Sequence, residues 1–347
     1  MTHGAALRSA IGAARYRLTG HRMPLAAWIA VTRRCNALCH YCALPLSKSV
    51  ELDTAQLVAL VDALAAKGTT RVTLTGGEPL LREDLGIVVD RCASHEMFTV
   101  IQTNGVLYPE RADELRRAAR LSIALDGDER AHDANREPGA WVSAVRAVRA
   151  AVSRGVDVHT LTTITRHNVD DLDVVLDMAE REGFVAEFEV LQHEPVVAEP
   201  LAADLAPEPA RLRRALLRLL DARLAGRPVA MSEKFLRYLL LWDRYDRPIS
   251  SEPHEDLHCL AGQLFVAVDT DGTMLPCPLW SRRFPGKNVV RDGLDAAFES
   301  VRDNPCRACT STALSEYNYV YNLNAPSVYE RVRAVIAHGP PGRGWAA

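Results

Sequence analysis

The stretch Cys35-Asn36-Ala37-Leu38-Cys39-His40-Tyr41-Cys42 decides the fold that this chain is expected to adopt. Its cysteines are separated by three and by two residues, and they follow an apolar run over residues 25–31. Thiolates suit iron–sulfur clusters and zinc, and a cubane cluster normally takes four of them. Because a fourth cysteine is missing nearby, a cluster held here would leave one iron open to a substrate or cofactor. A zinc ion bound by these thiols and His40 is the alternative.

A second motif, Gly76-Gly77-Glu78-Pro79, follows the strand-like residues 71–75. Together with the C-x3-C-x2-C spacing, it resembles the radical S-adenosylmethionine (SAM) superfamily. In that family SAM chelates the open iron of a [4Fe–4S] cluster through its amino and carboxylate groups. Reductive cleavage of SAM then gives a 5′-deoxyadenosyl radical that abstracts a hydrogen atom from the substrate. The resemblance also implies a flavodoxin or ferredoxin as electron donor. A zinc site would leave the Gly-Gly-Glu-Pro motif unexplained.

Short apolar runs alternate with helical patterns over residues 25–191. This alternation predicts an α/β fold with right-handed βαβ units and a parallel sheet. Six units fit the partial, TIM-like (βα)6 barrel of the radical SAM core, and such barrels carry their chemistry at the C-terminal strand ends. Strands are expected at 28–32, 71–75, 99–102, 121–125, 156–163 and 186–191, and helices at 54–66, 83–95, 109–119, 141–153 and 169–182.

Four segments are expected along the chain. Residues 1–24 predict a basic helical extension lying on the barrel, although a transit peptide would share this composition. The radical SAM core is expected over residues 25–195 and a helical linker over residues 196–256. Residues 257–347 predict a small α+β domain that contains a β-hairpin and a terminal helix.

A second group of cysteines comprises Cys259, Cys277, Cys306 and Cys309. Four thiolates can fully ligate a [4Fe–4S] cluster or a zinc ion, and the spacing alone leaves both open. The pattern C-x12-G-x4-C, followed by C-x2-C, resembles the auxiliary-cluster extension of radical SAM enzymes called SPASM, in its shortened "twitch" form. Ser315 stands where the full pattern has its next cysteine. One auxiliary [4Fe–4S] cluster is therefore expected.

The resemblance also implies which residues bind SAM. The Gly-Gly-Glu segment would meet the methionyl amino group, and Tyr41 would lie beside adenine. Ser122 and Asp126 would lie near the ribose and carboxylate, and Arg136 would pair with that carboxylate. Strand-end capping or ion pairing is the alternative role for these polar residues. The complete predicted set is Tyr41, Gly76, Gly77, Glu78, Pro79, Asn104, Ser122, Asp126, Arg136, Thr163 and Leu191.

The auxiliary cluster bears on the reaction. An electron acceptor beside a substrate radical favours oxidation of an alcohol, and Glu189, His193 and Glu194 near the sixth strand end are candidate bases. The four-cysteine set resembles dehydrogenases of aminoglycoside biosynthesis, so a sugar or cyclitol is the expected substrate, in natural-product biosynthesis. Residues 1–24 are expected to be too short to recognise a leader peptide. Alternatives are a sugar epimerase or decarboxylase, a maturase of ribosomally made peptides, and a non-enzymatic metal scaffold.

Composition narrows the possible partners and location. Lys and Arg number 41 and Asp and Glu number 44, without a long block of one sign, so a nucleic-acid partner is not indicated. The chain has no apolar run of the roughly 20 residues that cross a bilayer. Clustered cysteines without a secretory segment indicate metal ligation in a reducing compartment, here the cytoplasm. Cys92 stands apart in an apolar helical pattern and is expected to be a small buried hydrophobe.

Overall fold

The computed structural model describes residues 3–42, 50–192, 203–255, 257–280 and 284–323. Its centre is an eight-stranded sheet in the order β6-β5-β4-β3-β2-β1-β8-β9. Adjacent strands from β6 to β8 are parallel, and β8 and β9 are antiparallel. The predicted α/β class with a mostly parallel sheet is confirmed. The strands are β1 (Ala26–Thr32), β2 (Arg71–Gly76), β3 (Phe98–Thr103), β4 (Arg120–Ala124), β5 (Val158–Ile164), β6 (Val185–Val190), β8 (Phe265–Val268) and β9 (Met274–Leu275).

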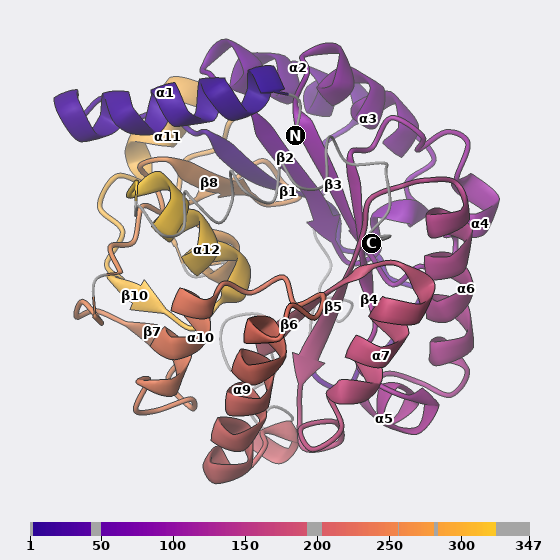
Figure 1. The fold of residues 1–347 in the computed structure, drawn as a ribbon. Helices are drawn as coiled ribbons and strands as arrows, with labels where there is room; N and C mark the ends of the chain where they lie inside the picture. The colour runs from indigo at the N-terminus through magenta and orange to yellow at the C-terminus, as the bar shows by residue number, and fades with distance from the viewer. Residues whose placement is uncertain (1–2, 43–49, 193–202, 256, 281–283, 324–347) are drawn as a thin grey trace.

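Helices connect the parallel strands and follow the outer side of the sheet (Figure 1). Local signals set their ends. The carboxylate of Asp53 accepts a hydrogen bond from the backbone N–H of Gln56 at 2.8 Å, and the Gln56 side-chain oxygen accepts one from the Asp53 N–H at 3.0 Å, so a capping box starts α2. The helices in this part are α1 (His3–Thr19), α2 (Thr54–Ala66), α3 (Leu85–Ser94), α4 (Tyr108–Arg111), α5 (Glu129–Asn135), α6 (Ala140–Ser153) and α7 (Asp173–Glu182).

The predicted helix at 109–119 is wrong beyond its first turn, because α4 ends at Arg111 and turns follow it. The Arg111 guanidinium donates hydrogen bonds to the backbone carbonyls of Leu80 and Arg82 in the preceding crossover. Leu115 is buried in the main core from a turn. Long-range contacts of this kind fix the chain after a single helical turn.

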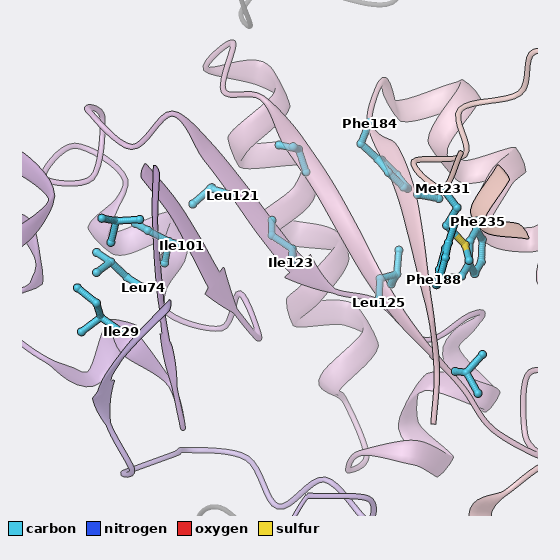
Figure 2. Close-up of a cluster of buried hydrophobic side chains, with 14 of the residues drawn as sticks. Ile29, Leu74, Ile101, Leu121, Ile123, Leu125, Phe184, Phe188, Met231 and Phe235 are labelled. Carbon is cyan, nitrogen blue, oxygen red and sulfur yellow. The ribbon is translucent and has the colours of Figure 1, made fainter. Parts of the chain in front are cut away.

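A row of apolar side chains crosses the sheet and forms the main core. Pairing places Ile29 opposite Leu74, Leu74 opposite Ile101, and Ile101 opposite Leu121. All four are at most 1% exposed, and Figure 2 shows them on neighbouring strands. Each such side chain contributes about 1.5–3 kcal/mol on burial. The core therefore fixes the strand register, and with it the positions of the strand ends that carry the motifs.

Two helices after β6 cover the end of the sheet. They are α9 (Pro209–Leu224) and α10 (Glu233–Leu240), which pack on each other. Between them the backbone pairs with Ala186 of β6: the Ala186 N–H donates to Pro228 and its carbonyl accepts from Ala230, both at 2.8 Å. Phe188 belongs to the same buried cluster as Phe235 of α10 (Figure 2). The edge of β6 is thus partly covered.

The predicted hairpin exists, and it extends the main sheet. β8 pairs in parallel with β1, so the hairpin of β8 and β9 continues the sheet beyond the first strand. A buried ion pair between Arg33 and Asp269 joins the end of β1 to the hairpin. The remaining elements are β7 (Ile249–Ser250), α11 (Leu294–Ser300), β10 (Ala308–Cys309) and α12 (Thr312–Tyr321), and β7 pairs antiparallel with β10.

The predicted terminal helix at 327–338 lies outside the described residues. Within the part of the chain that the structure describes, every helix is too short or too polar to cross a membrane.

Candidate functional site

The loop after β1 carries Cys35, Cys39 and Cys42, all partly exposed, whereas Cys92 is buried in α3. Burial raises the pKa of Cys35, and it raises the pKa of Cys39 to about 11; the negative charge of Cys42 adds to both shifts. The three thiols therefore lie near one another, and a bound cation would reverse the shifts. Burial also raises the pKa of Cys92 to about 12, as expected for an inert thiol.

The two glycines of the Gly-Gly-Glu-Pro motif hold the base of this loop. A Cβ atom would lie 2.1 Å from the carbonyl oxygen of Thr32 at Gly76, and 2.2 Å from that of Arg34 at Gly77. The close approach allows the Gly77 N–H to bond to Thr32 and the Glu78 N–H to bond to Arg34, both at 2.8 Å. Only glycine permits this fit, so the motif fixes the backbone directly before Cys35.

Glu78 is 1% exposed and caps the turn that follows it. Its Oε1 accepts hydrogen bonds from the Leu80 N–H at 2.9 Å and the Thr103 hydroxyl at 2.8 Å, and its Oε2 accepts from the Asn104 N–H at 2.7 Å. Burial raises the pKa of Glu78, although these hydrogen bonds oppose the shift. A carboxylate has about four acceptor positions, so one remains for a ligand ammonium. The Asn104 side chain donates to Asn36 at 2.8 Å and so ties β3 to the cysteine loop.

A buried network joins Cys39 to the ends of β4 and β5. Asp126 is fully buried; its Oδ2 accepts from Arg136 Nε at 2.7 Å and the Tyr41 hydroxyl at 2.9 Å, and its Oδ1 accepts from the Thr163 N–H at 2.9 Å. Arg136 also donates to the Cys39 sulfur at 3.3 Å and to the Tyr41 oxygen. Although burial alone would lower the pKa of Arg136, its anionic neighbours raise it. Arg136 therefore connects the sulfur of Cys39, a predicted cluster ligand, to the buried carboxylate of Asp126.

The sequence analysis missed two residues that support this network. The ring Nδ1 of His132 accepts a hydrogen bond from the Asp126 N–H at 2.9 Å, and the Asn168 side chain donates to the carbonyls of Asp126 and Thr163, both at 2.8 Å. Burial lowers the pKa of His132 to about 4, and the charge of Arg136 adds to this effect. His132 is therefore neutral at pH 7. The contacts of His132 and Asn168 depend on tertiary packing, and local sequence patterns do not reveal such packing.

The end of β6 contacts the segment that carries Cys309. Glu189 Oε2 accepts from the Thr312 N–H at 2.8 Å, and Glu189 Oε1 accepts from the Gln192 side chain at 2.9 Å. Gln192 also donates to Thr310 at 3.1 Å. Burial raises the pKa of Glu189 to about 8, although its hydrogen bond from Thr312 opposes the shift. Glu189 thus holds the first turn of α12, while its role as a base stays a prediction.

The same strand end also contacts the cysteine loop. Leu191 is 2% exposed and is buried with Leu205, and Tyr41 packs against this pair. The end of β6 therefore contacts both the segment that carries Cys39 and Cys42 and the segment that follows Cys309. His193 and Glu194, the other candidate bases, lie outside the described residues.

The structure brings Cys259, Cys277, Cys306 and Cys309 near one another from three segments, and Cys306 and Cys309 share the segment of β10. Cys259 is partly exposed and the other three are buried. Hydrogen bonding to Cys306 raises the pKa of Cys259, and burial raises the pKa of Cys277 and, to about 12, that of Cys309; neighbouring thiolates add to each shift. The pKa of Cys306 is lowered to about 6, mainly by its hydrogen bond with Cys259. Four soft donors at one place suit a cluster.

Two other residues of the predicted SAM set lie in a turn after β2 and in the middle of β4. Pro79 begins the short 3-10 turn η2 (Pro79–Leu81), and Ser122 is 7% exposed on β4. Among the residues that the structure describes, no three His, Cys, Asp or Glu side chains have the arrangement of a metal-ion site. The SAM contacts stay a prediction, and the structure assigns several of the same residues to holding the loop.

Comparison with known proteins identifies the family. Residues 29–179 match the family model "Radical SAM superfamily". Mycofactocin maturase MftC from Mycobacterium ulcerans is 30% identical over 283 residues, which cover 79% of this chain and 73% of that protein. The chain belongs to the radical SAM superfamily. As a radical SAM enzyme, it is expected to bind SAM and a [4Fe–4S] cluster, and the three-cysteine loop fits that cluster.

One further relative of this radical SAM enzyme and one solved structure of similar fold cover most of its length. The PqqA peptide cyclase from Ruegeria pomeroyi is 28% identical over 310 residues, which cover 82% of this chain and 79% of that protein. The crystal structure of Streptococcus suis SuiB bound to S-adenosylmethionine superposes with a TM-score of 0.66 at 14% identity, and covers 84% of this chain and 70% of that one. That likeness concerns the fold. For two other curated relatives, the match spans less than half of their length.

Proposed function

We propose that this radical SAM enzyme is a maturase that modifies a peptide with the help of an auxiliary [4Fe–4S] cluster. The cluster would be held by Cys259, Cys277, Cys306 and Cys309. One observation above all supports this: the end of β6 contacts the segments that carry the two cysteine groups, through Leu191 packed with Tyr41 and through Glu189 bonded to Thr312. A substrate at that strand end would therefore lie between the two clusters. The partial barrel and the separate auxiliary domain are part of this proposal.

The protein's own residues prepare the site for SAM. When bound, SAM and the cluster of the cysteine loop would supply the radical chemistry needed to break an unactivated C–H bond, which acid–base groups cannot do. Gly76 and Gly77 fix the loop, and Arg136 holds the Cys39 sulfur while Asp126 holds Arg136. Because Arg136 bonds both to Cys39 and to Asp126, the position of Cys39, a predicted cluster ligand, is coupled to the ends of β4 and β5.

The named relatives favour a peptide over a small metabolite. One is called a maturase and another a peptide cyclase, and both match most of this chain. The sugar or cyclitol substrate and the oxidation expected from the cysteine pattern have no support among these names. The cysteine pattern itself keeps the small-molecule dehydrogenase as a second candidate. Ser315 replaces the next SPASM cysteine; it is buried, and its hydroxyl donates to the Cys309 carbonyl at 3.1 Å.

Anaerobic reconstitution tests the proposal. We expect about eight irons and eight sulfides per chain, about four of each in Cys35→Ala and in Cys306→Ala, and no change in Cys92→Ala, the buried-thiol control. Cys35→Ala should abolish deoxyadenosine formation. Cys306→Ala should retain some of it but form no product.

Substrate choice needs a second assay. Deoxyadenosine formation is compared with short peptides encoded beside the gene and with sugars and cyclitols, and product is identified by mass spectrometry. Modification of a sugar but of none of the peptides would overturn the peptide assignment in favour of the dehydrogenase. Zinc without acid-labile sulfide at the four-cysteine site would overturn the auxiliary cluster. A flavodoxin or ferredoxin donor and a cytoplasmic location stay predictions.

A further inference from the structure

We propose that the side-chain N–H groups of Asn304 and Trp280 raise the reduction potential of the auxiliary cluster by donating hydrogen bonds to its cysteine sulfurs. This inference rests on the proposed function, because it requires a cluster at the four-cysteine site. It adds a role for two residues that hold no metal themselves.

Asn304 lies against two of the four sulfurs. Its Nδ2 is 3.2 Å from the Cys306 sulfur and 3.6 Å from the Cys259 sulfur, and the residue is 5% exposed. Other contacts fix the residue: its Oδ1 accepts from the Cys306 N–H at 3.4 Å, and its carbonyl accepts from Arg307 at 3.0 Å. A buried amide held on both sides is a preorganised donor toward the sulfurs.

Trp280 supplies a second donor from another loop. It ends the short 3-10 turn η3 (Pro278–Trp280), and its backbone N–H donates to the Cys277 carbonyl at 3.2 Å. Its indole N–H is buried and has no hydrogen-bond partner among the described residues. An indole nitrogen is a donor only, and leaving it buried and unpaired is costly, so it favours an acceptor such as a cluster sulfur. The Trp280 side chain interacts with the Cys306 side chain, so this N–H faces the Cys306 sulfur.

The direction of the effect follows from charge. Reduction adds one electron and makes the cluster and its sulfurs more negative, while the N–H protons stay on nitrogen. Hydrogen-bond donors therefore stabilise the reduced form more than the oxidised form, which raises the potential. Loss of one charge-assisted bond would lower the equilibrium constant for reduction about tenfold, which corresponds to about 59 mV for one electron.

The experiment is a redox titration followed by electron paramagnetic resonance. It uses the full chain with Cys35, Cys39 and Cys42 replaced by Ala, so that only the auxiliary cluster contributes a signal. This chain then receives either Asn304→Leu, which keeps the branching and the number of side-chain heavy atoms, or Trp280→Phe, which keeps an aromatic ring. Trp242→Phe is the matched control, because its indole N–H donates to the Arg244 carbonyl at 2.9 Å instead of to a sulfur.

We expect each test variant to keep about four irons and to lower the midpoint potential by about 59 mV, and the control to leave it unchanged. An unchanged potential in Trp280→Phe with the cluster retained overturns the role of Trp280, and the same result in Asn304→Leu overturns that of Asn304. If Asn304→Leu loses its iron, Asn304→Ala takes its place, because it removes the amide without adding volume. A parent chain without auxiliary iron refutes the proposed function as well, and that measurement comes first.

Discussion

Replacement of Gly77 by Ala tests whether the glycine pair holds the cysteine loop. The added Cβ would lie 2.2 Å from the Arg34 carbonyl oxygen, whereas ordinary contacts begin at 3.4 Å, so the two segments must separate by about 1.2 Å. This movement breaks two backbone hydrogen bonds, from Gly77 to Thr32 and from Glu78 to Arg34. At about 1 kcal/mol for each bond and about 1–3 kcal/mol for overpacking, the cost is roughly 3–5 kcal/mol.

Because Arg34 directly precedes Cys35, the expected consequence is local to the loop. We expect Gly77→Ala to lose about four irons and its deoxyadenosine formation, and urea unfolding to show a free energy lower by roughly 3–5 kcal/mol. The auxiliary cluster should remain.

Gly86→Ala is the matched control, because a Cβ there meets Glu114 at 3.4 Å, an ordinary contact, within α3. It should keep all its iron and gain about 0.5–1 kcal/mol from lower backbone entropy in the unfolded chain. If Gly77→Ala binds iron and cleaves SAM like the wild type, the glycine pair does not fix the loop. Equal losses in both variants would also contradict the interpretation.

Two further predictions follow from the buried groups. Because the pKa of His132 is about 4 in the folded state and about 6.5 when unfolded, stability is full above pH 6.5 and is lost as the pH falls toward 4, by at most about 3 kcal/mol. Between pH 7 and pH 4.5, urea unfolding should show a smaller loss of unfolding free energy for His132→Asn than for the wild type. Equal losses in the two proteins would contradict this. Glu189→Ala should lower the unfolding free energy by about 1–2 kcal/mol and reduce auxiliary iron, since the Thr312 N–H loses its acceptor. Glu189→Gln should preserve both the unfolding free energy and the auxiliary iron. Equal losses in the two variants would show that the charge of Glu189 matters more than its hydrogen bond from Thr312.

The sequence predicted the elements whose signals are local. The second strand was expected at 71–75 and spans Arg71–Gly76, and the helix expected at 54–66 matches α2 at both ends. Asp53 and Gln56 form the capping box there, and apolar residues repeat at helical spacing, so neighbouring residues hold all the information. The grouping of four distant cysteines was predicted from resemblance to a family.

What the sequence could not provide depends on contacts between distant residues. Helix α12 was not expected, and its first turn is held by Glu189, more than a hundred positions earlier. His132 was not assigned a role, because its function as an acceptor appears only when β4 brings Asp126 beside it. Glu78 was expected to face a ligand, yet the fold uses most of its acceptor capacity for the turn and β3.

The parallel pairing of β8 with β1 makes the strand that leads into Cys35 an interior strand, with β2 on its other side. A chain cut before β8 would leave β1 with bare backbone donors and acceptors, and such edges recruit other polypeptides. Expression of the residues before β8 alone would then yield aggregates in place of a small catalytic unit. The part of this protein from β8 onward is thus a folding requirement for the part before it.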